Sequence, residues 1–303
     1  MAVDLTEPLV IGVGSRALFD LEAENVIFER DGLEAYEKYQ LEHENDILPE
    51  GTAFHLIKSL LALNERAGEK IVEVIVTSRN SPNTSLRVFN SIKGYGLDIT
   101  RAALTGGKSL APYLSAFKTD LFLSANEDDV RQAVNSVAAA LILPESVHPS
   151  HCEAPGQIRI AFDGDAVIFA AEAEAVFKHD GLDAFMDHER DMADTPLGEG
   201  PFTGFLKKLA YIQSFFPDDA ESPIRTALVT ARNAPAHERA IKTLRYWNVK
   251  IDEAFFLGGV KKQDVLSAFG AHIFFDDQRV HAEPAAEVVP SAVVPYRVND
   301  NLE

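Results

Sequence analysis

The sequence contains one cysteine, Cys152, among its 303 residues. A single cysteine excludes an internal disulfide framework and is typical of proteins from a reducing compartment. The first residues, MAVDLTEPLV, have neither the basic start nor the apolar core of a signal peptide. No apolar run reaches the roughly 18 residues that a membrane span needs. These absences predict a cytoplasmic protein without a membrane partner.

Basic residues are also scarce, because 28 Lys and Arg stand against 47 Asp and Glu, which gives a formal net charge of −19. This charge disfavours nucleic acid or an anionic membrane surface as a partner. An anionic substrate would need a local positive site made of Lys, Arg, backbone N–H groups or a bound metal. The apolar fraction of 46% is ordinary for a globular protein, and the length suits roughly two domains.

The chain carries an internal repeat. Three segments of the first half recur in the second half in the same order: DGL at 31–33 and 180–182, VTSRN at 76–80 and VTARN at 229–233, and LFLSAN at 121–126 and IFFDDQ at 273–278. The offset changes only from 149 (180 − 31) to 153 (229 − 76). The sequence therefore predicts two copies of one structural unit.

Each copy alternates short apolar runs with segments of helical periodicity. Strands are expected at 9–13, 71–77, 99–104 and 121–126 in the first half and at 158–162, 226–230, 253–257 and 273–278 in the second. A helical insertion is expected after the first strand of each half, at about 20–50 and about 170–200. This alternation is typical of an α/β fold in which helices cover both faces of a mostly parallel sheet.

The stretch LPESVHPSHCEAPGQ at 143–157 is rich in proline and polar residues and predicts a linker. The expected domains are therefore residues 1–147 and 156–303. Four possible metal ligands lie in the linker: His148, His151, Cys152 and Glu153. They are too close together for the usual paired zinc spacings, so a solvated linker is the favoured interpretation.

Two aspartates, Asp163 and Asp165, follow the apolar run IRIAF at 158–162, with Gly164 between them. Residues two apart in extended chain point the same way, so both carboxylates would share one side of the strand's end. Neighbouring buried carboxylates repel each other and usually need a cation or a shared proton. The alternative is an ordinary Asp-Gly surface turn.

The other strand ends of the second half also carry reactive groups. Thr230 ends one strand, Lys261 and Lys262 follow another, and Asp276 and Asp277 end the last. Sites in parallel sheets lie at the carboxyl ends of the strands, so these groups are expected at one sheet edge.

The order of these motifs, DxD, then Thr, then Lys, then paired acids, resembles the haloacid dehalogenase-like phosphatase superfamily. Within it, AFDGDAVIF, TALVTARNAPAHERAIKTLRYW and HIFFDDQ are similar to the cytosolic type I 5′-nucleotidases. GSRALFD, YQLEHEN and LTGGKS extend the resemblance to the first half. The resemblance implies two tandem haloacid dehalogenase-like Rossmannoid units, each with a small helical cap insertion. It also implies a homo-oligomer and Mg²⁺-dependent hydrolysis of nucleoside 5′-monophosphates, AMP in particular.

The resemblance assigns the reacting groups to the first motif. Asp163 would be the nucleophile that forms an aspartyl-phosphate. Asp165 would be the general acid for the leaving oxygen and then the general base for water. Mg²⁺ would lie between Asp163, the phosphate and Asp276, with Asp277 as an additional or outer-shell ligand and the backbone carbonyl of Asp165 facing the metal.

The same resemblance assigns the phosphate-binding groups. Thr230 would donate its hydroxyl to the phosphoryl oxygens together with nearby backbone N–H groups, with Gly164, Ala231 and Arg232 as its substrate-binding neighbours. A lysine would offset the phosphate charge. Lys262 precedes Asp276 by 14 residues (276 − 262), a spacing that favours it over Lys261.

The first half lacks the catalytic carboxylates. By the repeat, Gly14 and Arg16 replace Asp163 and Asp165, and Ser124 and Ala125 replace Asp276 and Asp277, whereas Thr77 remains opposite Thr230. The first domain is therefore expected to be degenerate and non-catalytic. Arg16 and Thr77 would still suit a phosphate, so a regulatory nucleotide site is one hypothesis. A purely structural or assembly role is the favoured one.

Phe177 lies in the expected cap of the second half, where an aromatic ring could stack on a base. Phe28 occupies the matching place in the first half, which favours core packing for Phe177 instead. Two alternatives to a 5′-nucleotidase stay open: a phosphatase for another small phosphomonoester such as a sugar phosphate, and a non-catalytic nucleotide-binding regulator. The intact Asp163, Asp165, Thr230 and Asp276 disfavour the regulator.

Overall fold

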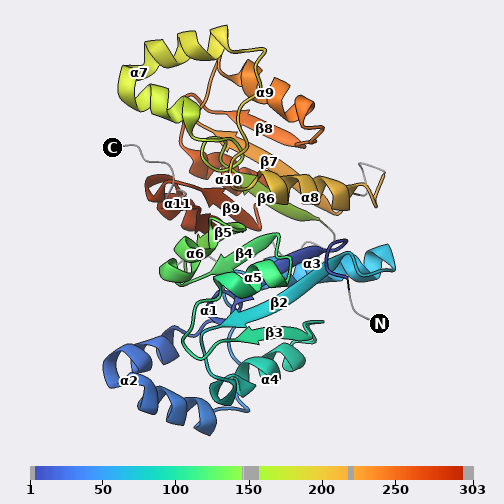
Figure 1. Cartoon of the computed structure of the whole chain (residues 1–303), viewed down its shortest axis with the longest axis vertical. Helices are drawn as coiled ribbons and strands as arrows, with labels where there is room; N and C mark the ends of the chain where they lie inside the picture. Colours follow the sequence, from blue (N-terminus) through green and yellow to red (C-terminus); the bar gives the residue numbers. More distant parts are fainter. Residues whose placement is uncertain (1–3, 145, 147–156, 218–221, 296–303) are drawn as a thin grey trace. The chain divides into compact units, whose positions relative to one another are not determined.

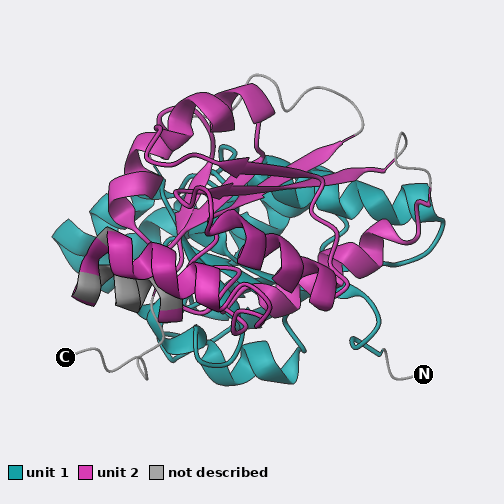
Figure 2. Ribbon diagram, turned by 90° about the horizontal axis from the view of Figure 1, so that it is seen from above, with its two compact units in different colours: residues 1–145 teal, residues 146–303 magenta. Residues whose placement is uncertain are grey.

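The computed structural model describes residues 4–144, 146, 157–217 and 222–295, and within 172–191 it leaves eight side chains undescribed (173–178, 180 and 182). The chain divides into two units, residues 1–145 and 146–303 (Figure 2). The possible ligands His148, His151, Cys152 and Glu153 lie outside the described residues.

Among the described residues each unit has five parallel strands, and those of unit 1 lie in the order β3-β2-β1-β4-β5. Its strands are β1 (Leu9–Gly14), β2 (Val72–Ser78), β3 (Arg101–Leu104), β4 (Leu121–Ser124) and β5 (Ala138–Ile142). Its helices are α1 (Ser15–Leu18), α2 (Glu22–Glu42), α3 (Phe54–Ala67), α4 (Leu86–Gly94), α5 (Ala111–Ala116) and α6 (Glu127–Ala133), with a 3₁₀ turn, η1 (Pro82–Thr84).

Unit 2 also contains five parallel strands, in the order β8-β7-β6-β9-β10. Its strands are β6 (Ile158–Phe162), β7 (Ile224–Thr230), β8 (Glu253–Phe256), β9 (Ile273–Asp276) and β10 (Ser291–Val293). Its helices are α7 (Glu172–Asp191), α8 (Thr203–Gln213), α9 (His237–Tyr246), α10 (Lys262–Phe269) and α11 (Arg279–Ala286).

The two units therefore have the same strand order. In each, the first strand of the unit is central, and the chain turns to its other side only with the fourth strand. In such sheets a crevice forms at the carboxyl ends of the two strands where the order reverses. These strands are β1 and β4 in unit 1 and β6 and β9 in unit 2.

The first long helix of each unit is broken at a glycine. Gly32 in α2 has φ 84° and Gly181 in α7 has φ 83°, a backbone conformation that residues other than glycine rarely adopt. Both glycines belong to the repeated DGL segment. The repeat thus preserves a bend, which divides each helix into two arms (Figure 1).

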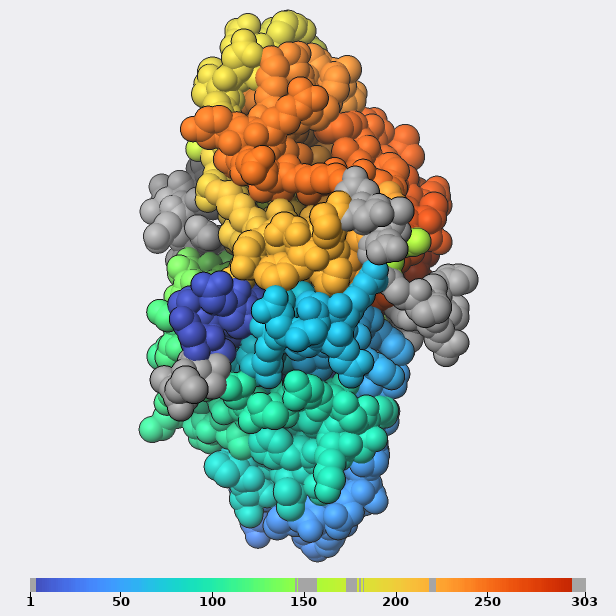
Figure 3. All heavy atoms as spheres, turned by 90° about the vertical axis from the view of Figure 1, so that its right-hand side faces the viewer, coloured from blue at the N-terminus to red at the C-terminus, as the bar shows by residue number. Residues whose placement is uncertain are grey.

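The inner strands are buried on both faces, as expected for a sheet covered by helices, whereas the outer strands β3 and β8 are only partly buried. All six residues of β1 and all seven of β2 are buried. In unit 2 the rings of Phe162, Phe202, Phe205 and Phe275 pack together with centroids 4.8–6.5 Å apart. The outer residues of α8 lie at the surface of unit 2 (Figure 3, amber). The packing of the four phenylalanine rings holds in place the strand ends that carry the polar residues.

Each expected strand begins and ends within two residues of an observed one, and the sequence analysis did not include β5 and β10 among the expected strands. The expected helical insertions contain α2 and α7. Among the described helices, none is both long enough and apolar enough to cross a bilayer.

Candidate active site

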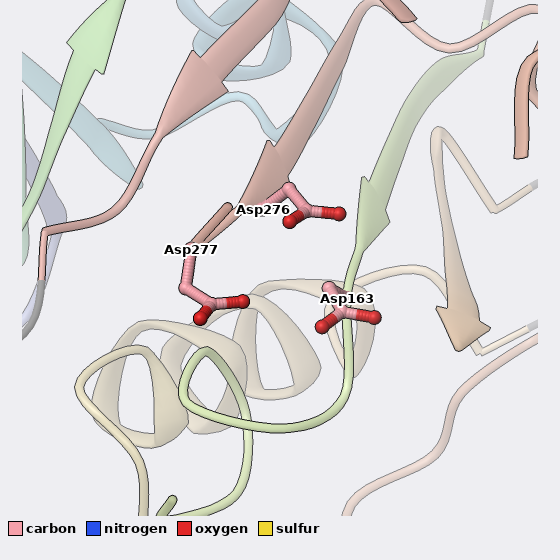
Figure 4. A group of neighbouring side chains, drawn as sticks. All are labelled: Asp163, Asp276 and Asp277. Atoms are coloured by element: carbon pink, nitrogen blue, oxygen red, sulfur yellow. The ribbon is translucent and has the colours of Figure 1, made fainter. Parts of the chain in front are cut away.

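Three buried carboxylates meet at the carboxyl ends of β6 and β9 in unit 2. Asp163 follows β6, Asp276 is the last residue of β9, and Asp277 comes next (Figure 4). One carboxylate oxygen from each lies within 4.8 Å of the others. The exposed fractions of the three residues are 6%, 0% and 8%. Three acids this close and this buried require a cation nearby.

Lys262, the first residue of α10, supplies one positive charge. Its Nζ donates to Oδ1 of Asp163 at 2.7 Å and to Oδ2 of Asp276 at 2.6 Å. Burial lowers the pKa of this ammonium, but the two carboxylates outweigh burial and raise the pKa above its ordinary value. Lys261, by contrast, is exposed and precedes the helix. Of the two candidate lysines, Lys262 is the one that contacts the carboxylates.

The carboxyl group of Asp163 is hard to ionise in this environment. Burial raises its pKa to about 7, and the charges of Asp276 and Asp165 add to the increase, although Lys262 opposes it. A divalent cation bound to the cluster would favour the ionised form.

Asp165 points to a different partner. Its two carboxylate oxygens accept from Arg232, Oδ2 from Nε at 2.9 Å and Oδ1 from Nη2 at 2.6 Å. Nη1 of Arg232 donates to Glu189, a buried residue of α7, and Glu189 also accepts from Nη1 of Arg239 at 2.7 Å. Burial lowers the pKa of Arg232, but Asp165 and Glu189 raise it above its ordinary range. This network holds the Asp165 carboxylate by a bidentate contact.

Gly164 allows the strand end of β6 to approach Thr230. A Cβ at position 164 would lie 3.2 Å from Oγ1 and 3.3 Å from Cβ of Thr230, tighter than ordinary contacts. The Thr230 hydroxyl oxygen accepts from the backbone N–H of Arg232 at 3.2 Å and is buried. The glycine between the two aspartates thus keeps the threonine beside them.

The donor set fits a hard divalent cation. Asp163, Asp276 and Asp277 offer only oxygen ligands, which Mg²⁺ prefers. With Lys262 included, the cluster still carries an excess of negative charge when all three acids are ionised. The carboxylate of Asp165 is not part of this cluster.

Comparisons with known proteins show the family of this chain. A family model described as 5′-nucleotidase matches residues 1–301. The chain belongs to the 5′-nucleotidase family. It is 39% identical over 288 residues to human "Cytosolic 5'-nucleotidase 1B", an alignment that covers 91% of this chain and 47% of the relative. The chain thus spans about half the length of the curated relative that it matches.

In this member of the 5′-nucleotidase family, the structure brings together Asp163, Lys262, Asp276 and Asp277, and it places Thr230 beside Gly164. Ala231 is exposed, and the Arg232 side chain is buried against Asp165 and Glu189. The side chain of Phe177 lies outside the described residues.

The sequence analysis did not identify Glu189 and Arg239. Glu189 lies in the expected cap insertion, and Arg239 lies in α9, 50 residues later. A single Glu and a single Arg on amphipathic helices have no spacing that indicates a contact between them. Only the fold shows that they fix the partner of Asp165.

Proposed function

We propose that this chain hydrolyses nucleoside 5′-monophosphates, AMP in particular, to a nucleoside and phosphate in a Mg²⁺-dependent reaction. The observation that carries the proposal is the buried group of Asp163, Asp276 and Asp277 bridged by Lys262 at the crevice of unit 2. Family membership over residues 1–301 and the name of the human relative support the nucleotide substrate.

We also propose that the two units are tandem haloacid dehalogenase-like units, each with a small helical cap, and that only the second is catalytic. The shared strand order and the equivalent breaks at Gly32 and Gly181 support a duplication. The catalytic unit would comprise residues 156–303, with a cap at about 170–200, and the degenerate unit residues 1–147.

Asp163, Asp276 and Asp277 would hold the Mg²⁺ ion. When bound, the ion would offset the negative charge of the site and of the phosphate dianion. Lys262 would place a second positive charge beside the phosphate oxygens, and Thr230 would donate its hydroxyl to them. Together these groups would orient the phosphorus toward Asp163.

In the first step a carboxylate oxygen of Asp163 attacks phosphorus and the bond from phosphorus to the 5′ oxygen breaks. The leaving oxygen takes a proton from Asp165, and the nucleoside departs. The products of this step are an aspartyl-phosphate at Asp163 and an ionised Asp165.

In the second step water attacks the phosphorus of the aspartyl-phosphate. Asp165 removes a proton from the water, the bond from phosphorus to Asp163 breaks, and phosphate leaves. Asp163 and Asp165 return to their starting states. The contact with Arg232 would position the ionised carboxylate of Asp165 for proton removal from water in the second step.

Phosphate release from a panel of nucleoside monophosphates and sugar phosphates, with Mg²⁺ and with chelator, tests the proposal. We expect release from nucleotides that requires Mg²⁺ and is lost in Asp163→Asn. Turnover of sugar phosphates alone would replace the nucleotide substrate with the alternative phosphomonoester. AMP binding without turnover of any substrate would support the non-catalytic regulator.

The human relative is named as cytosolic, and we propose a cytoplasmic location for this chain as well. We further propose a homo-oligomer, which size-exclusion chromatography with light scattering would test.

A further inference from the structure

Unit 1 contains a cavity at the place that corresponds to the active site of unit 2. The cavity has a volume of about 470 Å³, within the range of small-molecule sites. Its lining includes Gly14, Thr77 and Ser124 at the carboxyl ends of β1, β2 and β4, together with residues of α2. The crevice formed by the strand order is therefore open in this unit.

The repeat explains what opens the cavity. Gly14 and Ser124 replace Asp163 and Asp276. The paired glycines Gly106 and Gly107 have φ values of 56° and 87°, and Gly258 and Gly259 have 55° and 93°. This match places Leu110 opposite Lys262 (262 − 110 = 152, the offset of Ser124 from Asp276). The bridging lysine and its carboxylates are thus replaced by neutral side chains.

The arginine of the repeated VTSRN segment has changed partners. Arg232 donates to Asp165 and Glu189, but the corresponding residues of unit 1 are Arg16 and Gln40. Arg79 instead donates Nε–H to Asp129 at 2.6 Å, and its two Nη groups have no partner among the described residues. The Arg79 side chain is 32% exposed, whereas that of Arg232 is 1% exposed. Arg79 therefore offers donors to the cavity that it lines.

Thr77 provides a second donor. Its residue is only 1% exposed, it lines the cavity, and its hydroxyl has no hydrogen-bond partner among the described residues. Thr230, in contrast, accepts from a backbone N–H. A buried hydroxyl without a partner is unfavourable unless a ligand satisfies it. Arg16 also lines the cavity, and its buried Nε–H has no partner among the described residues.

The α2 side of the cavity is partly apolar. Phe28 and Leu33 line it and are 47% and 58% exposed, and the Phe28 ring meets Tyr36 edge-on at 5.9 Å. Phe28 is therefore not a residue of the core of unit 1. An exposed ring beside a polar cavity can stack on a base.

The acidic residues that line the cavity differ in how strongly they would repel a bound anion. Glu24 accepts from Arg87 at 2.5 Å, and Asp129 accepts from Arg79, so both charges are compensated. Glu37 also lines the cavity and could accept from a hydroxyl or amino group of a ligand.

We propose that this cavity binds a nucleoside monophosphate without hydrolysing it. The phosphate is held by Arg16, Arg79 and Thr77, and the base lies against Phe28.

This site does not depend on the proposed function of unit 2, because its test is binding and not turnover. AMP binding to the full chain is measured by equilibrium dialysis in an Asp163→Asn background, where hydrolysis is blocked, with Mg²⁺ present. We expect two equivalents of AMP. Arg16→Gln with Thr77→Val removes one of them, and Lys262→Met in the same background removes the other.

The choice of Arg16→Gln and Thr77→Val protects the fold, because Arg16 pairs only with the exposed Glu22 and the Thr77 hydroxyl has no partner to lose among the described residues. Each charged hydrogen bond lost should weaken the unit 1 site by about 10–100-fold. Inorganic phosphate is the second probe. Phe28→Ala should weaken AMP at this site by roughly 5-fold or more and leave phosphate binding unchanged.

Two equivalents of AMP that survive Arg16→Gln with Thr77→Val, or no second equivalent at millimolar AMP in the Asp163→Asn background, overturn the proposal. Equal loss of AMP and phosphate binding in Phe28→Ala also overturns it, because Phe28 would then support the structure of the site and not stack on a base. If the wild-type chain releases no phosphate from AMP but the Arg16-dependent equivalent persists, the proposed function fails and the unit 1 site stands.

Discussion

The ammonium of Lys262 lies 2.7 Å from Oδ1 of Asp163, the residue on which we place the nucleophile. The same ammonium lies 2.6 Å from Oδ2 of Asp276. One side chain thus joins the carboxyl ends of β6 and β9, the two strands at which the strand order of unit 2 reverses. The contact also means that the nucleophile and a proposed metal ligand share one positive charge when no metal is bound.

The first prediction concerns pH. The pKa of Asp163 is 3.8 when the chain is unfolded and about 7 when it is folded. The folded chain therefore holds a proton that the unfolded chain loses, and ionisation of Asp163 destabilises the fold as pH rises from about 4 to about 7. With chelator present, the free energy of unfolding of the wild type should fall relative to Asp163→Asn by up to about 1.4 kcal/mol per pH unit in this window. Thermal unfolding from pH 4 to 8 measures the difference, and parallel curves would contradict it.

The second prediction separates the two lysines. Lys262→Met should lower kcat by about 100-fold or more, because the charge that faces both Asp163 and the phosphate is lost. Lys261→Met is the matched control, since Lys261 is exposed and precedes α10, and it should leave kcat within about 2-fold. Steady-state phosphate release with saturating Mg²⁺ compares them. Equal losses in both variants would remove the special role of Lys262.

The third prediction tests the acidic cluster as a metal site. Asp277→Asn should raise the Mg²⁺ concentration needed for half-maximal activity by about 10-fold or more, because one anionic oxygen ligand is lost. Asp264→Asn, an exposed acid of α10, should not change it. Mg²⁺ titration of phosphate release is the measurement. An unchanged Mg²⁺ requirement in Asp277→Asn would show that this carboxylate is not a ligand.

The fourth prediction concerns the support of Asp165. Glu189 is fully buried and accepts from both Arg232 and Arg239. Glu189→Gln should destabilise the fold by about 3–5 kcal/mol, because the buried guanidinium of Arg239 loses its counter-charge and that of Arg232 keeps only Asp165. Asp194→Asn is the control, because it breaks only the exposed pair with Lys242, and it should leave the free energy of unfolding unchanged. Urea unfolding of the wild type and the two variants measures the free energy of unfolding. Equal values in all three would mean that the network does not stabilise the fold.

Local patterns were sufficient to predict most strands and the residues at their ends. The run at 158–162 is apolar, ends at Asp163, and coincides with β6. The strand β5 was missed because its sequence, AAALI, is rich in alanine, which favours helix more than strand. The repeat indicated the missing carboxylates of unit 1 directly, since Gly14 and Ser124 follow from counting residues.

Contacts between distant segments could not be predicted in the same way. Arg232 lies 67 residues from Asp165 and 43 residues from Glu189, so no local pattern indicates that its guanidinium is fully used. For the same reason the cavity of unit 1 could not be predicted from the sequence. Its volume depends on how α2 packs over the ends of β1 and β2. It also depends on Leu110, which stands in unit 1 where unit 2 has Lys262.

The most direct test of Asp163 as the nucleophile is a rapid acid quench of the wild-type chain during AMP turnover with Mg²⁺, followed by borohydride reduction and peptide mass spectrometry. An aspartyl-phosphate is reduced to homoserine, so we expect this product at position 163 and at no other acidic residue. Asp163→Asn should release no phosphate and give no reduced product. Phosphate release at the wild-type rate by Asp163→Asn, or turnover by the wild type without any modification at position 163, would contradict the mechanism.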